Sequence, residues 1–137
     1  MLLGGMMHYE YSHGGNYARR AKLTSRVRAE GRPCWICTLP IDYTLKGGGE
    51  AFNLDELQPR AYGGSPLDYN NVDAAHACCN NWRSVKSVML VARIREWIVA
   101  SGKVWQKPAQ FIALAKQAER EIRAGNAPER IDTTCDW

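Results

Sequence analysis

The chain has 137 residues, of which 45% are hydrophobic and 23% charged, and its formal net charge is +4. This length and composition predict one globular domain with a modest core and exclude a wholly disordered chain. The longest apolar stretch, near residues 85–100, is interrupted by charged residues such as Arg93 and Glu96, so we do not expect it to cross a membrane. Residues 1–3 lack the features of a signal peptide, so we expect a cytosolic protein with no membrane partner.

Residues 1–15 contain two glycine pairs and no clear hydrophobic period, so a flexible lead-in is expected there. Residues 16–137 are predicted to form a single domain. Its first helix, near residues 16–30, has a thin apolar stripe and many basic residues. Six of the 18 lysines and arginines lie between Arg19 and Arg32. Such a face would suit a polyanion, although a solvated helix surface explains the pattern equally well.

The middle of the chain predicts two short strands. Gly31 and Pro33 end the first helix, and a tight turn follows at residues 34–37. Strands are expected at residues 51–57 and 72–75, separated by a loop that is rich in glycine and proline. The next helix is predicted to begin near His76. Strands and helices of this kind give an α+β fold.

Two C-terminal helices are predicted at about residues 84–125. The first covers about 84–100, and the second has Pro108 in its first turn, where the missing N–H costs little. Each helix has apolar residues at helical spacing. In the first helix these residues are Val85, Val88, Met89, Ile94, Trp97 and Ile98. We interpret both stripes as core and not as a groove for a partner.

Two pairs of potential metal ligands stand out, Cys34-x-x-Cys37 and His76-x-x-Cys79. A gap of two residues lets both side chains of a pair converge on one tetrahedral Zn²⁺ ion. A lone Cys-x-x-Cys can be a redox pair, but the βαβ context of that motif is absent. Cys78 is an alternative to Cys79; on a helix, however, positions three apart share a face whereas positions two apart diverge by about 200°. We therefore expect His76 and Cys79 to complete a structural zinc site that stabilises the fold.

The residues between these pairs resemble a nuclease motif. The sequence reads Asp55-Glu56-Leu57-x-Pro59-x-x-x-Gly63-Gly64 and then Asn71-Val72-x-x-x-His76-x-x-Cys79-Asn80. Over about residues 32–86 the chain is similar to the HNH endonuclease family, and in particular to its zinc-stapled, phage-type members. Here Asp-Glu stands where Asp-His is usual, and His-x-x-Cys stands where Cys-x-x-Cys is usual.

The resemblance implies a ββα-metal finger that is stapled by zinc and flanked by helices. Asp55 and Asn80 match ligands of a catalytic divalent ion, and their hard oxygen atoms suit Mg²⁺ or Mn²⁺. Asn71 matches the asparagine whose side chain braces the loop. Glu56 falls where the general-base histidine is expected, and an unperturbed glutamate with a pKa of about 4.3 is a weak base.

The function implied by the resemblance is metal-dependent nicking or cutting of double-stranded DNA, in which a metal stabilises the charge on the phosphate and a base activates water. A role in phage genome processing inside a bacterial host, with packaging proteins as partners, is also implied. The residues expected to hold DNA phosphates are basic ones near the motif and on the first helix: Arg60, Arg83, Lys86, Arg19, Arg20 and Arg26. Two alternatives are a zinc-stapled DNA-binding module that has lost catalysis through Glu56 and a zinc-bearing protein-interaction domain.

Overall fold

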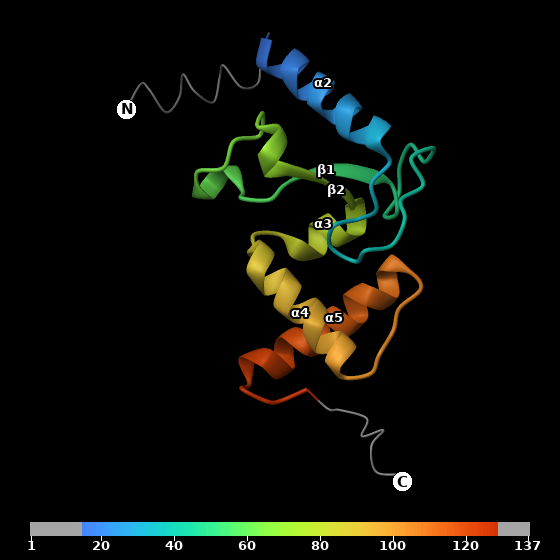
Figure 1. The fold of residues 1–137 in the computed structure, drawn as a ribbon, viewed down its shortest axis with the longest axis vertical. Helices are drawn as coiled ribbons and strands as arrows, with labels where there is room; N and C mark the ends of the chain where they lie inside the picture. Colours follow the sequence, from blue (N-terminus) through green and yellow to red (C-terminus); the bar gives the residue numbers. More distant parts are fainter. Residues whose placement is uncertain (1–14, 129–137) are drawn as a thin grey trace.

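The computed structural model describes residues 15–128 (Figure 1). The elements within this range are helix α2 (Gly15–Glu30), strand β1 (Phe52–Glu56), the 3-10 turns η1 (Arg60–Tyr62) and η2 (Tyr69–Asn71), strand β2 (Val72–His76), and helices α3 (Ala77–Arg83), α4 (Val88–Ala100) and α5 (Pro108–Arg123). The predicted α+β class is confirmed. The expected flexible lead-in lies outside the described residues except for Gly15, which begins α2.

The two strands form a small antiparallel sheet between helical layers. Phe52 pairs with His76 at one end, and Glu56 pairs with Val72 at the other. Figure 1 shows α2 along one side of the sheet and α3, followed by α4 and α5, on the other side. Because side chains alternate along a strand, successive residues of β1 face different helices. Glu56 contacts Arg20 of α2, whereas the preceding Asp55 contacts Arg83 of α3.

Helix α2 attaches to the sheet through few apolar residues. It buries Leu23 and Val27, which are one turn apart on the same face. It ends at Gly31, whose φ of 63° is the left-handed conformation that glycine adopts without steric cost. This narrow contact leaves most of the basic side chains of α2 exposed to solvent.

The turn at residues 34–37 lies against the outer edge of β2. The Trp35 N–H donates to the carbonyl of Ala74 at 2.9 Å. From the other side, Arg95 of α4 donates to the carbonyls of Trp35 and Ile36 at 3.2 and 2.9 Å, and the Trp105 indole donates to that of Cys37 at 2.7 Å. The C-terminal helices therefore help to hold the turn that carries two of the four predicted zinc ligands.

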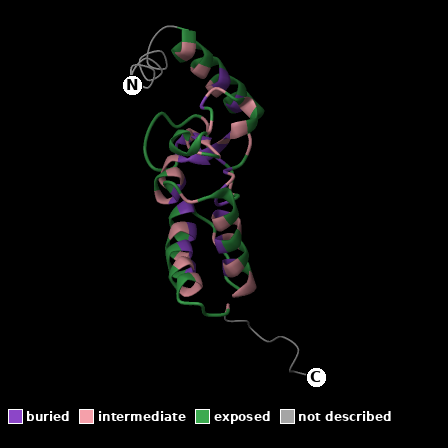
Figure 2. Cartoon of the chain, turned by 90° about the vertical axis from the view of Figure 1, so that its left-hand side faces the viewer, coloured by how far each residue is buried: buried purple, intermediate pink, exposed green. Residues whose placement is uncertain are grey.

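Helices α4 and α5 pack against each other through buried aliphatic and aromatic side chains. In Figure 2 the buried residues of this pair lie mainly on the sides that face each other, and the exposed residues lie on the outer sides. Phe111 of α5 is fully buried and meets the ring of Trp82 edge-on at 5.8 Å between centroids. This contact joins the C-terminal pair to α3. Within the described residues no helix is long and apolar enough to span a bilayer.

The start of α4 differs from the prediction. The helix begins at Val88, with Ser87 as its N-cap. Ser84 adopts a φ of 50°, which ends α3, so residues 84–87 are not helical. Val85, Val88 and Met89 are 55%, 39% and 82% exposed. The prediction that these three side chains belong to the core is wrong, because residues 15–128 provide nothing that covers this end of the stripe. Ile94 and Ile98 are buried as predicted.

Candidate functional site

The four predicted zinc ligands come together in one buried cluster. Cys34 and Cys37 come from the turn, His76 from the end of β2 and Cys79 from the first turn of α3. Their ligand atoms all lie within 4.8 Å of one another. The His76 Nδ1 is 3.3 Å from the Cys37 Sγ and 3.8 Å from the Cys79 Sγ. Ligands of a tetrahedral zinc ion with Zn–S bonds near 2.3 Å are separated by about 3.8 Å, so the cluster could hold a zinc ion.

The second ring nitrogen of His76 fixes which nitrogen faces the cluster. Nε2 lies 3.0 Å from the carbonyl oxygen of Pro40, which can only accept a hydrogen bond. Nε2 must therefore carry the proton, and Nδ1 is left with its lone pair directed towards the three sulfur atoms. A hydrogen bond of this kind on the far side of the ring is typical of histidines that ligate metals.

The thiols of the cluster also fit a cation. Hydrogen bonds from the thiols of Cys37 and Cys79 lower the pKa of Cys34 to about 2. Cys34 in turn raises the pKa of Cys37 to about 12, and Cys34 and Cys37 raise that of Cys79. Without a cation the cluster therefore favours one thiolate and resists two more, whereas a bound Zn²⁺ would stabilise all three thiolates.

Cys79, and not Cys78, joins the cluster. Cys79 is fully buried, whereas Cys78 is half-buried and faces the loop at Gly49. The helical-face argument from the sequence is thereby confirmed.

Asp55 is buried at the end of β1 and held by three hydrogen bonds from two side chains. The residue is 5% exposed, and the Arg83 Nη1 donates to both of its carboxylate oxygens at 3.1 Å. The Trp35 Nε1 donates to Oδ2 at 2.9 Å. Burial raises the pKa of Asp55, and the charge of Arg83 and the Trp35 hydrogen bond offset this only in part. Both carboxylate oxygens are therefore already engaged by donors.

Trp35 was missed by the sequence reasoning because it stands between two ligand positions and has no charge. Its indole nitrogen reaches Asp55, and the Arg83 guanidinium lies over its ring at 5.2 Å. Trp35 therefore links the zinc-ligand turn directly to the acidic site. The one signal in the sequence was its position inside the Cys-x-x-Cys pair.

Glu56 points away from Asp55. Its carboxylate lies 3.4 Å from the Arg20 Nη2 on the α2 side of the sheet. Glu56 still pairs with Val72, so β1 is regular to its end and no bulge turns the two acids towards one another. On a regular strand adjacent residues face opposite sides of the sheet, which keeps Glu56 away from Asp55.

Asn71 spans the loop between the strands. Its Nδ2 donates to the carbonyls of Gln58 and Ser65 at 3.0 Å, and its Oδ1 accepts from the Gln58 N–H at 2.9 Å. Gly64 lies beside this brace, and a Cβ there would be 1.7 Å from the Gln58 oxygen. The loop therefore requires both the amide of Asn71 and the missing side chain of Gly64.

Asn80 lies on α3, one turn before Arg83. Positions three apart share a helix face, so Asn80 belongs to the face from which Arg83 reaches Asp55. The Asn80 side chain is half-buried, and within residues 15–128 it makes no hydrogen bond. It is thus a polar side chain without a hydrogen-bond partner in residues 15–128, on the helix that ends in Arg83.

Arg83 does not match the phosphate-binding role that was expected of it. It is 1% exposed, and besides Asp55 its guanidinium donates to the carbonyls of Glu56, Leu57 and Lys86. A buried guanidinium with these partners is not available to a DNA backbone. Its role in this structure is to fasten the end of α3 to the end of β1.

The other basic candidates differ in how exposed their side chains are and in which groups they contact. Arg19 is exposed, and Arg26 stacks over the ring of Tyr69 at 3.6 Å. Arg20 is half-buried and donates to the Pro66 carbonyl at 2.6 Å as well as to Glu56.

Two further candidates lie nearer the motif. Arg60 is exposed on η1 and has a partner within the chain. Lys86 is half-buried, donates to the Trp82 carbonyl at 2.9 Å and lies 3.8 Å from Glu119. Arg19 on α2 is therefore the most accessible of the predicted phosphate contacts.

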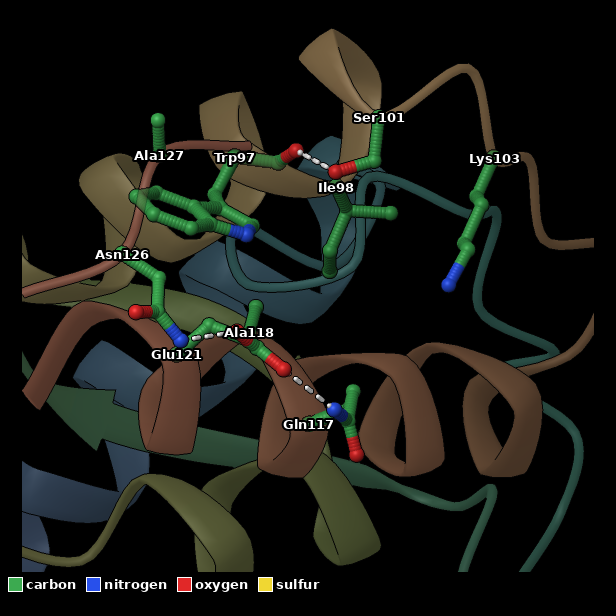
Figure 3. Close-up of a pocket in the computed structure, with 9 residues that line it drawn as sticks. All are labelled: Trp97, Ile98, Ser101, Lys103, Gln117, Ala118, Glu121, Asn126 and Ala127. Carbon is green, nitrogen blue, oxygen red and sulfur yellow. Dashed lines mark hydrogen bonds between the residues drawn. The ribbon is translucent and has the colours of Figure 1, made fainter. Parts of the chain in front are cut away.

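A separate pocket of about 350 Å³ opens at the far end of α4 and α5 (Figure 3). Its polar side chains bond to one another: Asn126 and Gln117 both donate to Glu121 at 2.7 Å, and Ser101 donates to the Trp97 carbonyl at 2.8 Å. None of the predicted ligands or acids lines it. The pocket is therefore distinct from the candidate site.

Comparison with known proteins adds no assignment. No protein-family model, no curated protein and no solved structure gives a significant match to this chain. The residue pattern and the geometry described above are the whole basis for a functional argument.

Proposed function

We propose that this protein is a zinc-stapled, metal-dependent endonuclease of the HNH type that hydrolyses phosphodiester bonds of double-stranded DNA. The observation that carries the proposal is the order β1, loop, β2, α3, with the Cys₃His cluster at the junction of β2 and α3. An HNH nuclease places its reactive groups on such a strand–strand–helix unit. Asp55, Asn71 and Asn80 occupy the end of the first strand, the loop and the helix of this unit.

The zinc ion in this proposal is structural. Bound by Cys34, Cys37, His76 and Cys79, it joins the turn to the start of α3. It supplies folding free energy that a core of this size lacks. Because Trp35 lies in the same turn and donates to Asp55, the zinc site also fixes the position of the acidic group.

A catalytic Mg²⁺ or Mn²⁺ would be held by Asp55 and Asn80 and would stabilise the charge that develops on the scissile phosphate. Oxygen ligands of this type fit a hard cation. Asp55, however, is engaged by Arg83, so cation binding requires that the guanidinium give up at least one of the two carboxylate oxygens. Asn80 has no competing hydrogen bond in residues 15–128.

Two observations favour a second candidate, a zinc-stapled DNA-binding module without catalysis. Arg83 already neutralises Asp55, and Glu56 faces α2 and not the Asp55 side of the sheet. A general base must come within hydrogen-bonding reach of the attacking water, so Glu56 can act only if the end of β1 rearranges. In this candidate α2 supplies the contacts with DNA, through exposed side chains such as Arg19.

A plasmid-nicking assay with Mg²⁺ or Mn²⁺ separates the two candidates. For the nuclease we expect conversion of supercoiled to open-circular DNA that falls at least about 100-fold in Asp55→Asn and in Asn80→Ala. Asp42→Asn serves as the matched control, because Asp42 is an exposed carboxylate that bonds to Thr44 and not to the groups around Asp55. Full activity of Asp55→Asn would contradict the assignment of the metal ligand.

DNA binding, measured in parallel by fluorescence anisotropy, tests the second candidate. Wild-type protein that binds DNA but never nicks it, together with a Glu56→His variant that gains nicking, would establish the binding module. A folded protein that neither binds nor nicks DNA would contradict both candidates and leave a zinc-bearing interaction domain. We extend the proposal to a role in phage genome processing, with packaging proteins as partners and the cytoplasm of a bacterial host as the location. This extension depends on the nuclease activity.

A further inference from the structure

The outward face of α4 is unusually apolar for a surface helix. Val85, Met89 and Val99 are 55%, 82% and 61% exposed. Met89 and Val99, with Ala92 and Glu96, follow the spacing of three and four residues that defines one helix face, and Val85 lies in the segment just before α4. The opposite face of α4 is also apolar and packs inside the molecule through Val91, Ile94 and Ile98. Exposed apolar side chains that cluster on one surface often mark an interaction site, and residues 15–128 leave this face uncovered.

An apolar hollow lies at each end of the same face. One, of about 540 Å³, is lined by Leu57, Pro59 and Tyr62 together with Val85, Val88 and Met89. The polar groups in its wall are already paired, since Asn71 bonds across the loop and the Ser87 hydroxyl accepts from the Leu90 N–H. The other hollow, of about 360 Å³, is lined by Leu39, Val99, Val104 and Trp105. Both hollows therefore suit apolar side chains.

Two charged residues lie near the centre of the face, Arg93 and Glu96, and both are exposed. If two copies of α4 packed in parallel about a two-fold axis, Arg93 would meet Arg93 and Glu96 would meet Glu96. If they packed antiparallel, Arg93 of each copy would meet Glu96 of the other. The face is thus complementary to itself in one direction only, which is the requirement for a symmetric dimer.

That ionic register also aligns the apolar residues. With Arg93 opposite Glu96 of the partner copy, Met89 falls opposite Ala100 at the end of the partner helix. Val104 is 83% exposed and lies at the second hollow. The hollow beside Met89 of one copy then lies near the end of the partner helix that carries Val99 and the second hollow.

We propose that a second copy of this chain covers the outward face of α4, in an antiparallel, two-fold pair in which Arg93 meets Glu96 of the partner copy. A helix of 13 residues is about 20 Å long and about 10 Å wide. Such a strip and its two hollows would bury a few hundred Å² per copy, below the roughly 800 Å² per partner of a standard stable interface. We therefore expect a weak, reversible dimer and test it at micromolar concentrations. This proposal is independent of the nuclease activity.

Sedimentation equilibrium of the full chain, purified without chelators and studied from low to high micromolar concentration, tests the dimer. We expect the mass to rise from the 15.4 kDa of one chain towards twice that value. Met89→Glu should raise the dissociation constant at least about tenfold, because it places a charge in an apolar hollow. Tyr17→Glu is the matched control, since Tyr17 is 72% exposed on α2, far from α4 in Figure 1, and should leave the dimer unchanged.

A charge-swap mixture tests the register. Arg93→Glu alone and Glu96→Arg alone should each weaken the dimer about tenfold or more, because like charges then meet at both symmetric positions. Mixed in equal amounts, the two variants should form a heterodimer, since every pair across the interface again has opposite charges. This recovery also shows that both variants are folded.

Three results would overturn the proposal. The first is a wild-type chain that remains monomeric at all concentrations. The second is a dimer that persists in Met89→Glu or is lost in Tyr17→Glu. The third is a mixture of the two charge variants that dimerises no better than either variant alone, which would exclude the antiparallel register.

Discussion

Asp55 and Arg83 form the most consequential pair of single residues in the molecule. An ion pair taken out of water gains little net stability, because the cost of removing both charges from solvent offsets their attraction. The raised pKa of Asp55 is in line with this, since burial outweighs the charge of Arg83. Removing only one of the two residues nevertheless costs much stability, because the remaining charge is then buried without a partner.

We predict that Arg83→Met lowers the free energy of unfolding by about 3–5 kcal/mol, measured by urea denaturation. Asp55→Asn should also lower the free energy of unfolding. The double variant should lose less stability than the sum of the two single variants, because it leaves no buried charge without a partner. Arg123→Met is the control, since Arg123 forms an exposed pair with Glu119 and its loss should cost less than about 1 kcal/mol. Strictly additive losses would show that the pair is not energetically coupled.

At the scale of elements, the loop between β1 and β2 is held by the side chain of Asn71 and the close approach of Gly64. Neither feature is visible as hydrophobic periodicity. The loop nevertheless sets where β2 begins, because the Leu57 N–H also donates to the Asn71 carbonyl at 2.7 Å. The pairing of β1 with β2 therefore depends on a segment that has little regular structure of its own.

We predict that Gly64→Ala destabilises the protein by about 1–3 kcal/mol, because its Cβ would overlap the Gln58 carbonyl and force the loop to move. Thermal melting gives the stability, and hydrogen exchange at the Gln58 amide reports the loss of its bond to Asn71. Gly47→Ala is the matched control, since nothing lies within 4 Å of a Cβ there and its φ is not positive. Equal melting temperatures for the two variants would contradict the close contact at Gly64.

At the scale of the whole molecule, the Cys₃His cluster joins segments that are far apart in the sequence. It connects the turn at residues 34–37, the end of β2 and the start of α3. Arg95 and Trp105 then connect that turn to the C-terminal helices. The cluster thus lies at the centre of the contacts that unite the sheet with the α4–α5 pair.

We predict one zinc ion per chain by metal analysis, and a loss of more than about 3 kcal/mol of stability when zinc is chelated or Cys79 is changed to serine. Cys78→Ser is the matched control, because Cys78 is the neighbouring cysteine outside the cluster and its loss should cost about 1 kcal/mol or less. Folded protein that contains no zinc, or equal losses in the two cysteine variants, would contradict the site.

Much of the fold was predicted from the sequence, because it depends on local spacing. The α+β class, the two strands, the helix that begins after His76 and the choice of Cys79 over Cys78 follow from strand and helix periods that act over a few residues. The ligand pairs could be recognised because their spacing fits the geometry of one tetrahedral ion. These features required no knowledge of distant contacts.

What the tertiary structure decided depends on which surfaces meet. Arg83 was expected at the surface and lies buried against Asp55, and Trp35 contacts that acid although only its position inside the Cys-x-x-Cys pair marks it in the sequence. Met89 was expected in the core and lies exposed, because helix periodicity identifies a face but not the length over which a partner covers it. The sequence by itself thus determined the elements and the metal ligands, whereas the electrostatic state of the acidic site arose only when turn, strand and helix packed together.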